Sequence, residues 1–197
     1  MNLKQRTVAI EGTIAVDVHD PETPRVWLEV LACSPDSKEH EALVVTNARP
    51  SHIHAALLLL GVEPGEPGRV EWDGAKVKPI APRGPGVGVA FVTTVGTDGK
   101  TEQIAPEQWI ILSTTGKPPE QLRFVFSGSG FTTTKARGTT YAADNAGTII
   151  GLTTFGTETI ALVDVFSPDT GLQAPEFLAS SNLPKRGTSV TMIITVR

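Results

Sequence analysis

The chain of 197 residues carries 17 Lys and Arg residues against 21 Asp and Glu residues, which gives a net charge of −4. No segment concentrates Lys and Arg, so we expect no nucleic-acid partner. The apolar runs are far shorter than the roughly 20 residues that span a bilayer, so we expect no transmembrane segment. The length predicts a single domain over residues 1–197, large enough to fold without a disulfide or a structural metal.

Short segments rich in Val, Ile, Thr and Phe are separated by 19 Gly and 15 Pro residues. This punctuation is typical of an antiparallel β protein. Trp27, Trp72 and Trp109 lie singly in such segments, so we expect them to pack in or against the core. Strands are predicted at residues 6–18, 25–33, 40–46, 69–73, 87–95, 108–114, 122–127, 131–135, 139–143, 147–155, 159–166 and 188–196.

One segment has the pattern of a helix. Ser51, after Pro50, is a candidate N-cap, the following Ala and Leu run favours a helix, and Gly61 stands where a terminating glycine is expected. The fold class is therefore predicted as mostly β, and α+β only by its one helix. We expect an antiparallel sandwich-like or barrel-like domain with one short helix near residues 51–60.

Three further segments have turn chemistry. Asp98-Gly99 and "DNAG" at 144–147 predict tight hairpins, and "SGSG" at 127–130 predicts a strand-to-strand turn. The "YAADN" stretch also gathers Tyr141, Asp144 and Asn145, for which a small binding site is the alternative to an ordinary turn.

The stretch "CSPDSKEHEALVV" places the single cysteine, Cys33, seven residues before His40. If 25–33 and 40–46 pair as a hairpin, Cys33 lies directly opposite His40, with side chains on one face. Glu41 then points to the other face. The predicted helix carries His52 and His54, which diverge by about 200° on a regular helix, so we expect His54 to face inward and His52 to lie nearer the rim.

Three interpretations of these residues compete. In the first, Cys33 is a small buried hydrophobe, His54 is a core histidine bonded to a backbone carbonyl, and "SKEHE" is a solvated turn. In the second, Cys33, His40 and His54, with Glu41 or His52 as additional ligands, bind zinc or copper. In the third, Cys33 is a nucleophile and His40 its base, assisted by Glu41 or Lys38.

From about residue 10 to the end, the chain resembles the YdjY family of bacterial proteins. The resemblance is carried by the block around Cys33, "LEVLACSPDSKEHEALVV", and by four further stretches: "PSHIHAALLLLGVEPGEPG", "FVFSGSGF", "YAADNAGTIIGL" and "NLPKRGTSVTMIITV". The resemblance implies an extracytoplasmic setting and no established activity. Some relatives look ferredoxin-like because they carry additional cysteine clusters. This chain has one cysteine, so an iron–sulfur cluster is not expected here.

We therefore expect an exported, non-enzymatic ligand-binding or interaction domain, whose small ligand or protein partner the sequence does not identify. A transition-metal site at Cys33, His40 and His54 would be one form of it. The alternative is a thiol-dependent hydrolase or redox enzyme that uses Cys33 with His40. The opening residues "MNLKQRTVAIEG" lack the apolar stretch of a signal peptide, so the family setting predicts a signal upstream of residue 1.

Overall fold

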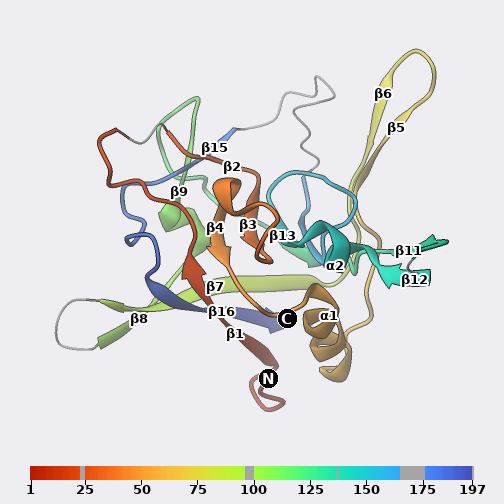
Figure 1. Cartoon of the computed structure of the whole chain (residues 1–197), viewed down its shortest axis with the longest axis horizontal. Coiled ribbons are helices and arrows are strands. Elements are labelled where there is room, and N and C mark those ends of the chain that lie inside the picture. Colours follow the sequence, from red (N-terminus) through yellow and green to blue (C-terminus); the bar gives the residue numbers. More distant parts are fainter. Residues whose placement is uncertain (23–24, 96–99, 137, 165–175, 197) are drawn as a thin grey trace.

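A computed structural model describes residues 1–22, 25–95, 100–136, 138–164 and 176–196 (Figure 1). Its helical elements are η1 (Glu39–Glu41), α1 (Pro50–Leu59), η2 (Pro106–Trp109) and α2 (Ala142–Ala146). Its strands are β1 (Thr7–Ile14), β2 (Trp27–Leu28), β3 (Val30–Cys33), β4 (Ala42–Val45), β5 (Arg69–Trp72), β6 (Val77–Ile80), β7 (Gly86–Val95), β8 (Lys100–Ile104), β9 (Ile110–Leu112), β10 (Phe124–Phe126), β11 (Phe131–Thr134), β12 (Gly138–Tyr141), β13 (Thr148–Gly151), β14 (Ile160–Leu162), β15 (Phe177–Ala179) and β16 (Ser189–Val196).

The main sheet closes into a barrel. Its strands run in the order β10-β14-β13-β3-β4-β1-β16-β7, and a pairing between β7 and β10 completes the circle, with β8 added beyond β7. Each strand of the circle therefore pairs with a neighbouring strand on both sides, and the circle has no free edge strand. The prediction of a mostly β, barrel-like fold with one helix is confirmed.

The alternation of buried and half-buried side chains explains which face of β16 and β1 is turned to the barrel core. Along β16 the residues alternate between buried and half-buried, with Met192 and Ile194 fully buried. Opposite them on β1, Ile10 pairs with Met192 and Val8 pairs with Ile194. Directly opposed residues share a face. One face of this pair therefore fills the barrel core, where the Phe91 and Trp109 rings also stack with centroids 4.7 Å apart.

The predicted antiparallel hairpin between 25–33 and 40–46 is wrong. β3 and β4 pair in parallel, with Val30 opposite Ala42 and Cys33 opposite Val45. Ala42, Leu43 and Val44 are all buried, as are all four residues of β3. Strands buried on both faces show continuous apolar runs, which are typical of parallel pairing, whereas a half-exposed hairpin alternates. β13 and β14 form a second parallel pair in the barrel.

Residues 34–41 carry the chain back from the end of β3 to the start of β4. A Glu39 carboxylate oxygen accepts the Ser37 backbone N–H at 2.9 Å, and the Ser37 hydroxyl donates to the Ser34 carbonyl at 2.6 Å. The Glu29 N–H donates to the Glu41 carbonyl, which holds η1 beside the beginning of β3. This crossover is much shorter than the usual connection of a dozen or more residues between parallel strands.

Helix α1 begins one residue earlier than its predicted cap. Arg49 is the N-cap residue, Pro50 is the first helical residue, and Ser51 does not cap the helix. Instead the Ser51 N–H and hydroxyl donate to the two carboxylate oxygens of Asp144 at 2.8 Å and 2.6 Å. The predicted terminating glycine is confirmed, because Gly61 has a φ of 76° and its N–H donates to the Leu58 carbonyl.

Several other predictions need correction. The "DNAG" stretch does not form a hairpin turn: its first three residues belong to α2, and Gly147 ends that helix in the left-handed conformation. The "SGSG" stretch links β10 to β11 as predicted, but it is an irregular connection between two different sheets and not a hairpin turn. The predicted Asp98-Gly99 hairpin falls outside the described residues. Strands β6, β8 and β15 were not predicted.

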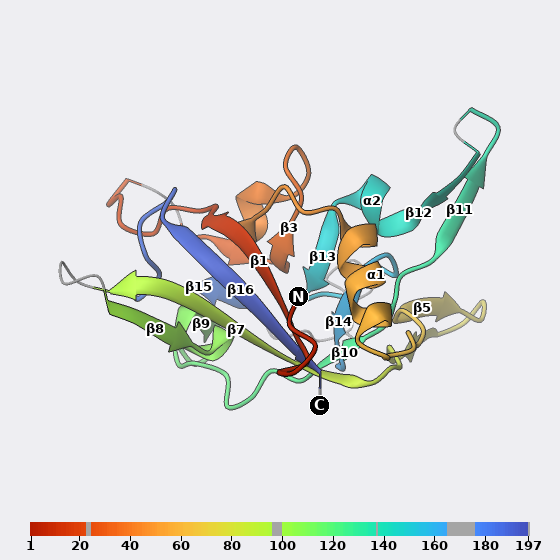
Figure 2. The same ribbon diagram turned by 90° about the horizontal axis from the view of Figure 1, so that it is seen from below.

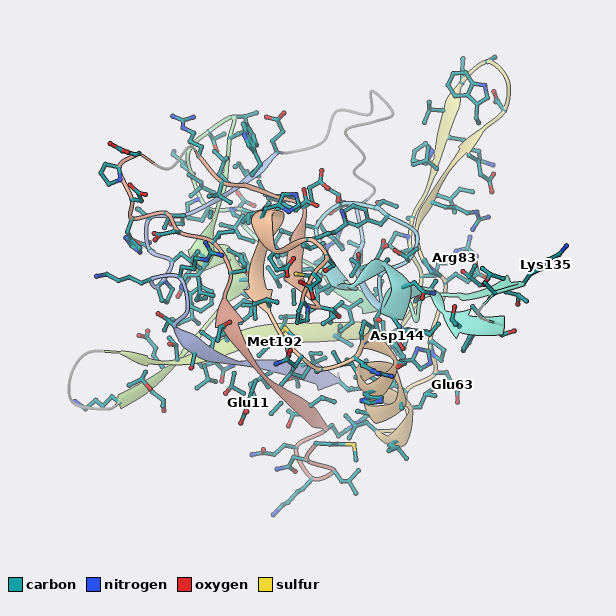
Figure 3. The ribbon with its side chains drawn as sticks, in the orientation of Figure 1. Glu11, Glu63, Arg83, Lys135, Asp144 and Met192 are labelled. Carbon is teal, nitrogen blue, oxygen red and sulfur yellow. The ribbon has the colours of Figure 1, made fainter. Side chains whose placement is uncertain are left out.

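Two hairpins project from the barrel as arms. Figures 1 and 2 show β5–β6 and β11–β12 reaching outward on the side of the molecule where α1 lies. Each forms a separate two-stranded sheet. Figure 3 places Lys135 at the outer end of the β11–β12 arm. In the described part of the chain, no helix is long and apolar enough to cross a membrane.

Candidate functional site

Cys33 is fully buried at the end of β3. It packs with Val30 and Ala42, and the partly buried Phe155 covers this small cluster. Burial raises the pKa of the Cys33 thiol, and the charges of Glu39 and Glu41 act in the same direction, although hydrogen bonds from Ser37 and Lys38 oppose the change. A raised pKa lowers the thiolate fraction at neutral pH, which opposes nucleophilic attack and metal ligation.

His40 does not lie opposite Cys33. It sits in η1 with 78 % of its side chain exposed, and its Nε2 is 3.8 Å from a carboxylate oxygen of Glu41. Lys38 donates to Glu41 at 2.8 Å and places its Nζ 4.3 Å from the centre of the Phe155 ring. Lys38 therefore contacts both Glu41 and the ring of Phe155, which packs against the Cys33 cluster.

His54 faces inward from α1, as predicted. Its Nδ1 lies 3.1 Å from the Gly128 carbonyl and 2.9 Å from the Tyr141 hydroxyl, and that hydroxyl donates its proton to the same carbonyl at 2.7 Å. Both neighbours of Nδ1 thus present oxygen lone pairs, so Nδ1 carries the proton and Nε2 does not. Burial lowers the pKa of His54, and the hydrogen bond to Gly128 opposes this effect.

The His54 ring is also packed between aromatic rings. Its centroid lies 5.0 Å from that of Phe126 and 5.2 Å from that of Tyr141, both in edge-on contact. These contacts match the interpretation of His54 as a core histidine bonded to a backbone carbonyl. His52 is exposed on the outer side of the helix, as expected.

The predicted Cys/His cluster is not formed. Among the described residues, no group of three or more His, Cys, Asp or Glu side chains is arranged to hold a metal ion, and Cys33, His40 and His54 all belong to the described part. The reason lies in the parallel pairing, which brings the start of β4, and η1 with His40 just before it, beside the start of β3, while Cys33 stands at the end of β3. The residues proposed as a zinc or copper site are therefore separated by the fold.

The β5–β6 arm is amphipathic. Val70 pairs with Pro79 and Trp72 pairs with Val77, so these four side chains share one face. Trp72 is 69 % exposed and stands next to the turn. The prediction that this tryptophan packs against the core is wrong, whereas Trp109 is buried as expected. A wholly apolar face on a projecting hairpin is unusual for a free surface.

The opposite face of the arm is charged and internally paired. Glu71 pairs with Lys78 in the register and accepts a hydrogen bond from Arg69 at 2.8 Å. At the turn, the Asp73 carboxylate accepts the N–H groups of Ala75 and Lys76 at 3.0 Å and 2.8 Å. The arm therefore gathers its charged side chains on one face, together with Ile80 opposite Arg69, and carries only apolar side chains on the other.

Glycines fix the root of the arm against the barrel. A Cβ on Gly84 would lie 2.1 Å from the Phe126 carbonyl oxygen, and a Cβ on Gly65 would lie 1.9 Å from the Arg83 oxygen. The Gly65 N–H donates to the Phe126 carbonyl at 3.0 Å. Only glycine permits such close approach of backbone to backbone. The arm is thus attached directly to β10.

Comparison with known protein families matches residues 1–195 to the YdjY domain. The chain belongs to the YdjY domain family. No curated protein and no solved structure matches the chain.

The arm of this YdjY domain was missed because its second strand contains Pro79. A proline inside a strand pattern argues against a central strand, since it lacks the N–H that the ladder needs. In a two-stranded arm each strand has a free edge, so Pro79 costs no ladder hydrogen bond there. The signal in the sequence was Asp73-Gly74 between Val70, Trp72 and Val77, which is typical of a hairpin with one apolar face.

Proposed function

We propose that this YdjY domain is an exported, non-enzymatic interaction domain that presents the β5–β6 arm to a partner protein. The observation that carries the proposal is the apolar face of the arm, on which Trp72 is 69 % exposed. Tryptophan is enriched among the residues that dominate binding energy at protein interfaces, and such residues stand inside a ring of apolar contacts. Val77 lies directly opposite Trp72 on this face, and Val70 and Pro79 form the next pair along it.

The attachment of the arm supports the same function. Backbone contacts at Gly65 and Gly84 hold its root on β10. A binding element that is fixed before it meets its partner loses less conformational entropy on association. The barrel then serves as the rigid support from which the arm reaches its partner.

The buried thiol supports a non-enzymatic role. Cys33 is covered by Phe155, and burial raises its pKa, so neither access nor ionisation favours a nucleophile. No feature of His40 changes this, because its exposed ring is turned to Glu41.

The interaction is tested by crosslinking from the two faces of the arm. A photoreactive amino acid replaces Pro79 on the apolar face or Glu71 on the charged face in the full-length protein, expressed in its own host. We expect a discrete adduct from position 79 and none from position 71, because the partner covers one face only. The adduct should disappear in Trp72→Ser. Equal adducts from both faces, or an adduct that is insensitive to Trp72→Ser, would contradict the proposal.

The export part of the proposal rests on the setting that family membership implies. It is tested by fractionating cells that express the natural gene and adding protease to intact cells or spheroplasts. We expect the domain to be degraded with no lysis of the inner membrane, while a cytoplasmic marker survives. Protection of the domain together with that marker would show that it is not exported.

A further inference from the structure

A cavity of about 470 Å³, with both polar and apolar lining, lies where three distant segments meet. The residues after β3, the segment leading into α1, and the end of β12 with α2 form its walls. Figure 3 shows Asp144 on α2 at the point where that helix approaches α1. A few hundred cubic ångströms is the usual size of a small-molecule site, and such sites depend on a few polar groups for orientation.

Two opposite charges line the cavity. Arg49 is exposed and lines the cavity, and no hydrogen bond or ion pair of its guanidinium is found among the described residues, so its five N–H donors are available to a ligand. Asp144 accepts one hydrogen bond on each carboxylate oxygen, both from Ser51. Each oxygen has a further lone pair, so Asp144 can accept another donor while it continues to hold the start of α1.

Two carboxamides and two prolines complete the walls. The Asn145 Nδ2 donates to the Thr140 hydroxyl at 2.7 Å. The Oδ1 of the same carboxamide is then the atom that can accept a hydrogen bond from a ligand. Asn47 lines the same cavity, and Pro35 and Pro50 supply apolar surface. The cavity thus offers a cation, an anion, and amide groups that both donate and accept, beside an apolar wall.

From this arrangement we propose that the cavity binds a small zwitterion that carries a carboxylate and an ammonium group, as a free amino acid or a short peptide does. The carboxylate pairs with Arg49, whose planar guanidinium matches it in geometry. The ammonium binds Asp144. A doubly charged anion such as phosphate fits less well, because the Asp144 carboxylate in the same cavity repels it.

The test uses L-alanyl-L-alanine as the probe and ¹H–¹⁵N NMR of the whole chain as the readout. We expect concentration-dependent shifts of the amides near Arg49 and Asn145. N-acetylated dipeptide and dipeptide amide each lack one charge, and each should bind at least about fivefold more weakly, which is the factor for losing one solvent-exposed ion pair of ~1 kcal/mol.

Two variants locate the charges. Arg49→Gln and Asp144→Asn should each weaken binding of the dipeptide by at least about fivefold. Asn at 144 can still accept the Ser51 N–H, so α1 keeps its partner, and an otherwise unchanged spectrum verifies the fold. Arg25→Gln is the matched control, because Arg25 lines a different cavity, and it should bind as the wild type does.

Tighter binding in Asp144→Asn, with acetate binding as well as the dipeptide, would show a simple anion site and overturn the zwitterion. Absence of any shift at millimolar dipeptide would overturn the site altogether. Neither result bears on the proposed role of the β5–β6 arm, because no residue of that arm lines this cavity. Failure of the zwitterion site is therefore distinguishable from failure of the proposed interaction.

Discussion

At the scale of single residues, burial controls the chemistry of two ionisable side chains, Cys33 and Glu158. Cys33 is fully buried, and Glu158 is 1 % exposed in the loop that follows β13. Phe155 of the same loop covers Cys33, and the Thr157 N–H donates to the Glu158 carboxylate at 2.9 Å. One loop therefore protects a thiol and encloses a carboxylate.

Cys33 should react slowly with thiol reagents. Both its cover and its raised pKa limit attack at pH 7, and no metal is required to explain the protection. We expect labelling to be slow with or without a chelator and to become fast in denaturant. Thr133→Cys on the exposed β11 strand, made in a Cys33→Ala background, provides the rate for an accessible thiol. Rapid labelling of native Cys33 would favour the enzyme alternative, and labelling that a chelator accelerates would favour the metal.

Glu158 should make the protein less stable as the pH rises toward neutrality. Burial raises the pKa of Glu158 to about 7 from an ordinary value of 4.5, against opposing hydrogen bonds from the backbone. The folded state therefore binds this proton more tightly than the unfolded state does. The contribution of Glu158 to the free energy of unfolding is present in full below pH 4.5 and falls between pH 4.5 and 7. Above that range the free energy of unfolding is lower by on the order of 3 kcal/mol from this group.

The measurement is the free energy of unfolding in urea at pH 5 and at pH 8, for the wild type and for Glu158→Gln. We expect the fall between the two pH values to be smaller in the variant, which keeps an acceptor for the Thr157 N–H and does not ionise. An equal fall in both proteins would show that other groups cause it.

At the scale of elements, glycine positions decide how the β5–β6 arm joins the barrel. Gly84 has a φ of 151°, and a Cβ at this position would clash with the Phe126 carbonyl. Gly116 also has a positive φ, of 65°, but has open space around it. A Cβ at Gly116 would therefore add backbone strain alone, whereas a Cβ at Gly84 would add backbone strain and a steric clash.

Gly116→Ala should cost about 1–2 kcal/mol, which is the cost of placing a residue with a Cβ in the left-handed region. Gly84→Ala should cost more than about 3 kcal/mol, because the new Cβ meets backbone that cannot move aside. Unfolding in urea gives both values. Similar losses at the two sites would mean that the root of the arm yields, and that the arm is less rigid than the proposed function requires.

At the scale of the whole molecule, the core and the projecting parts are separate in their energetics. The barrel interior holds the large buried side chains, among them Phe91, Phe126 and Trp109. The arm contributes exposed or half-buried residues only. An isolated two-stranded hairpin is marginally stable in water, so the arm adds little to the stability of the barrel.

Replacing residues 70–79 by a short Gly-Ser turn should therefore change the free energy of unfolding by less than about 1 kcal/mol. Leu57→Ala serves as the contrast, since Leu57 is fully buried on the inner face of α1 and its truncation should cost about 2–5 kcal/mol. Both are measured by urea unfolding. A loss of stability in the shortened arm as large as that in Leu57→Ala would show that the arm belongs to the folding core.

The sequence by itself determined the properties that depend on local pattern. Gly and Pro punctuation predicted the β fold, alternation predicted β16, and the run after Pro50 ending at Gly61 predicted α1. His54 pointed inward because helical periodicity places it beside Leu57. Each of these follows from residues a few positions apart, which the chain order already brings together.

Only the tertiary structure decided which strands are neighbours. The continuous burial of β3 and β4 allows a parallel pair as well as a hairpin, and the choice depends on β1 and β13, which flank them in the barrel. That choice separated His40 from Cys33. It also brought Asp144 to Ser51 and Arg49 to Asn145 across more than ninety residues of sequence. Strand pairing is decided by long-range contacts, which the spacing of residues along one chain does not specify.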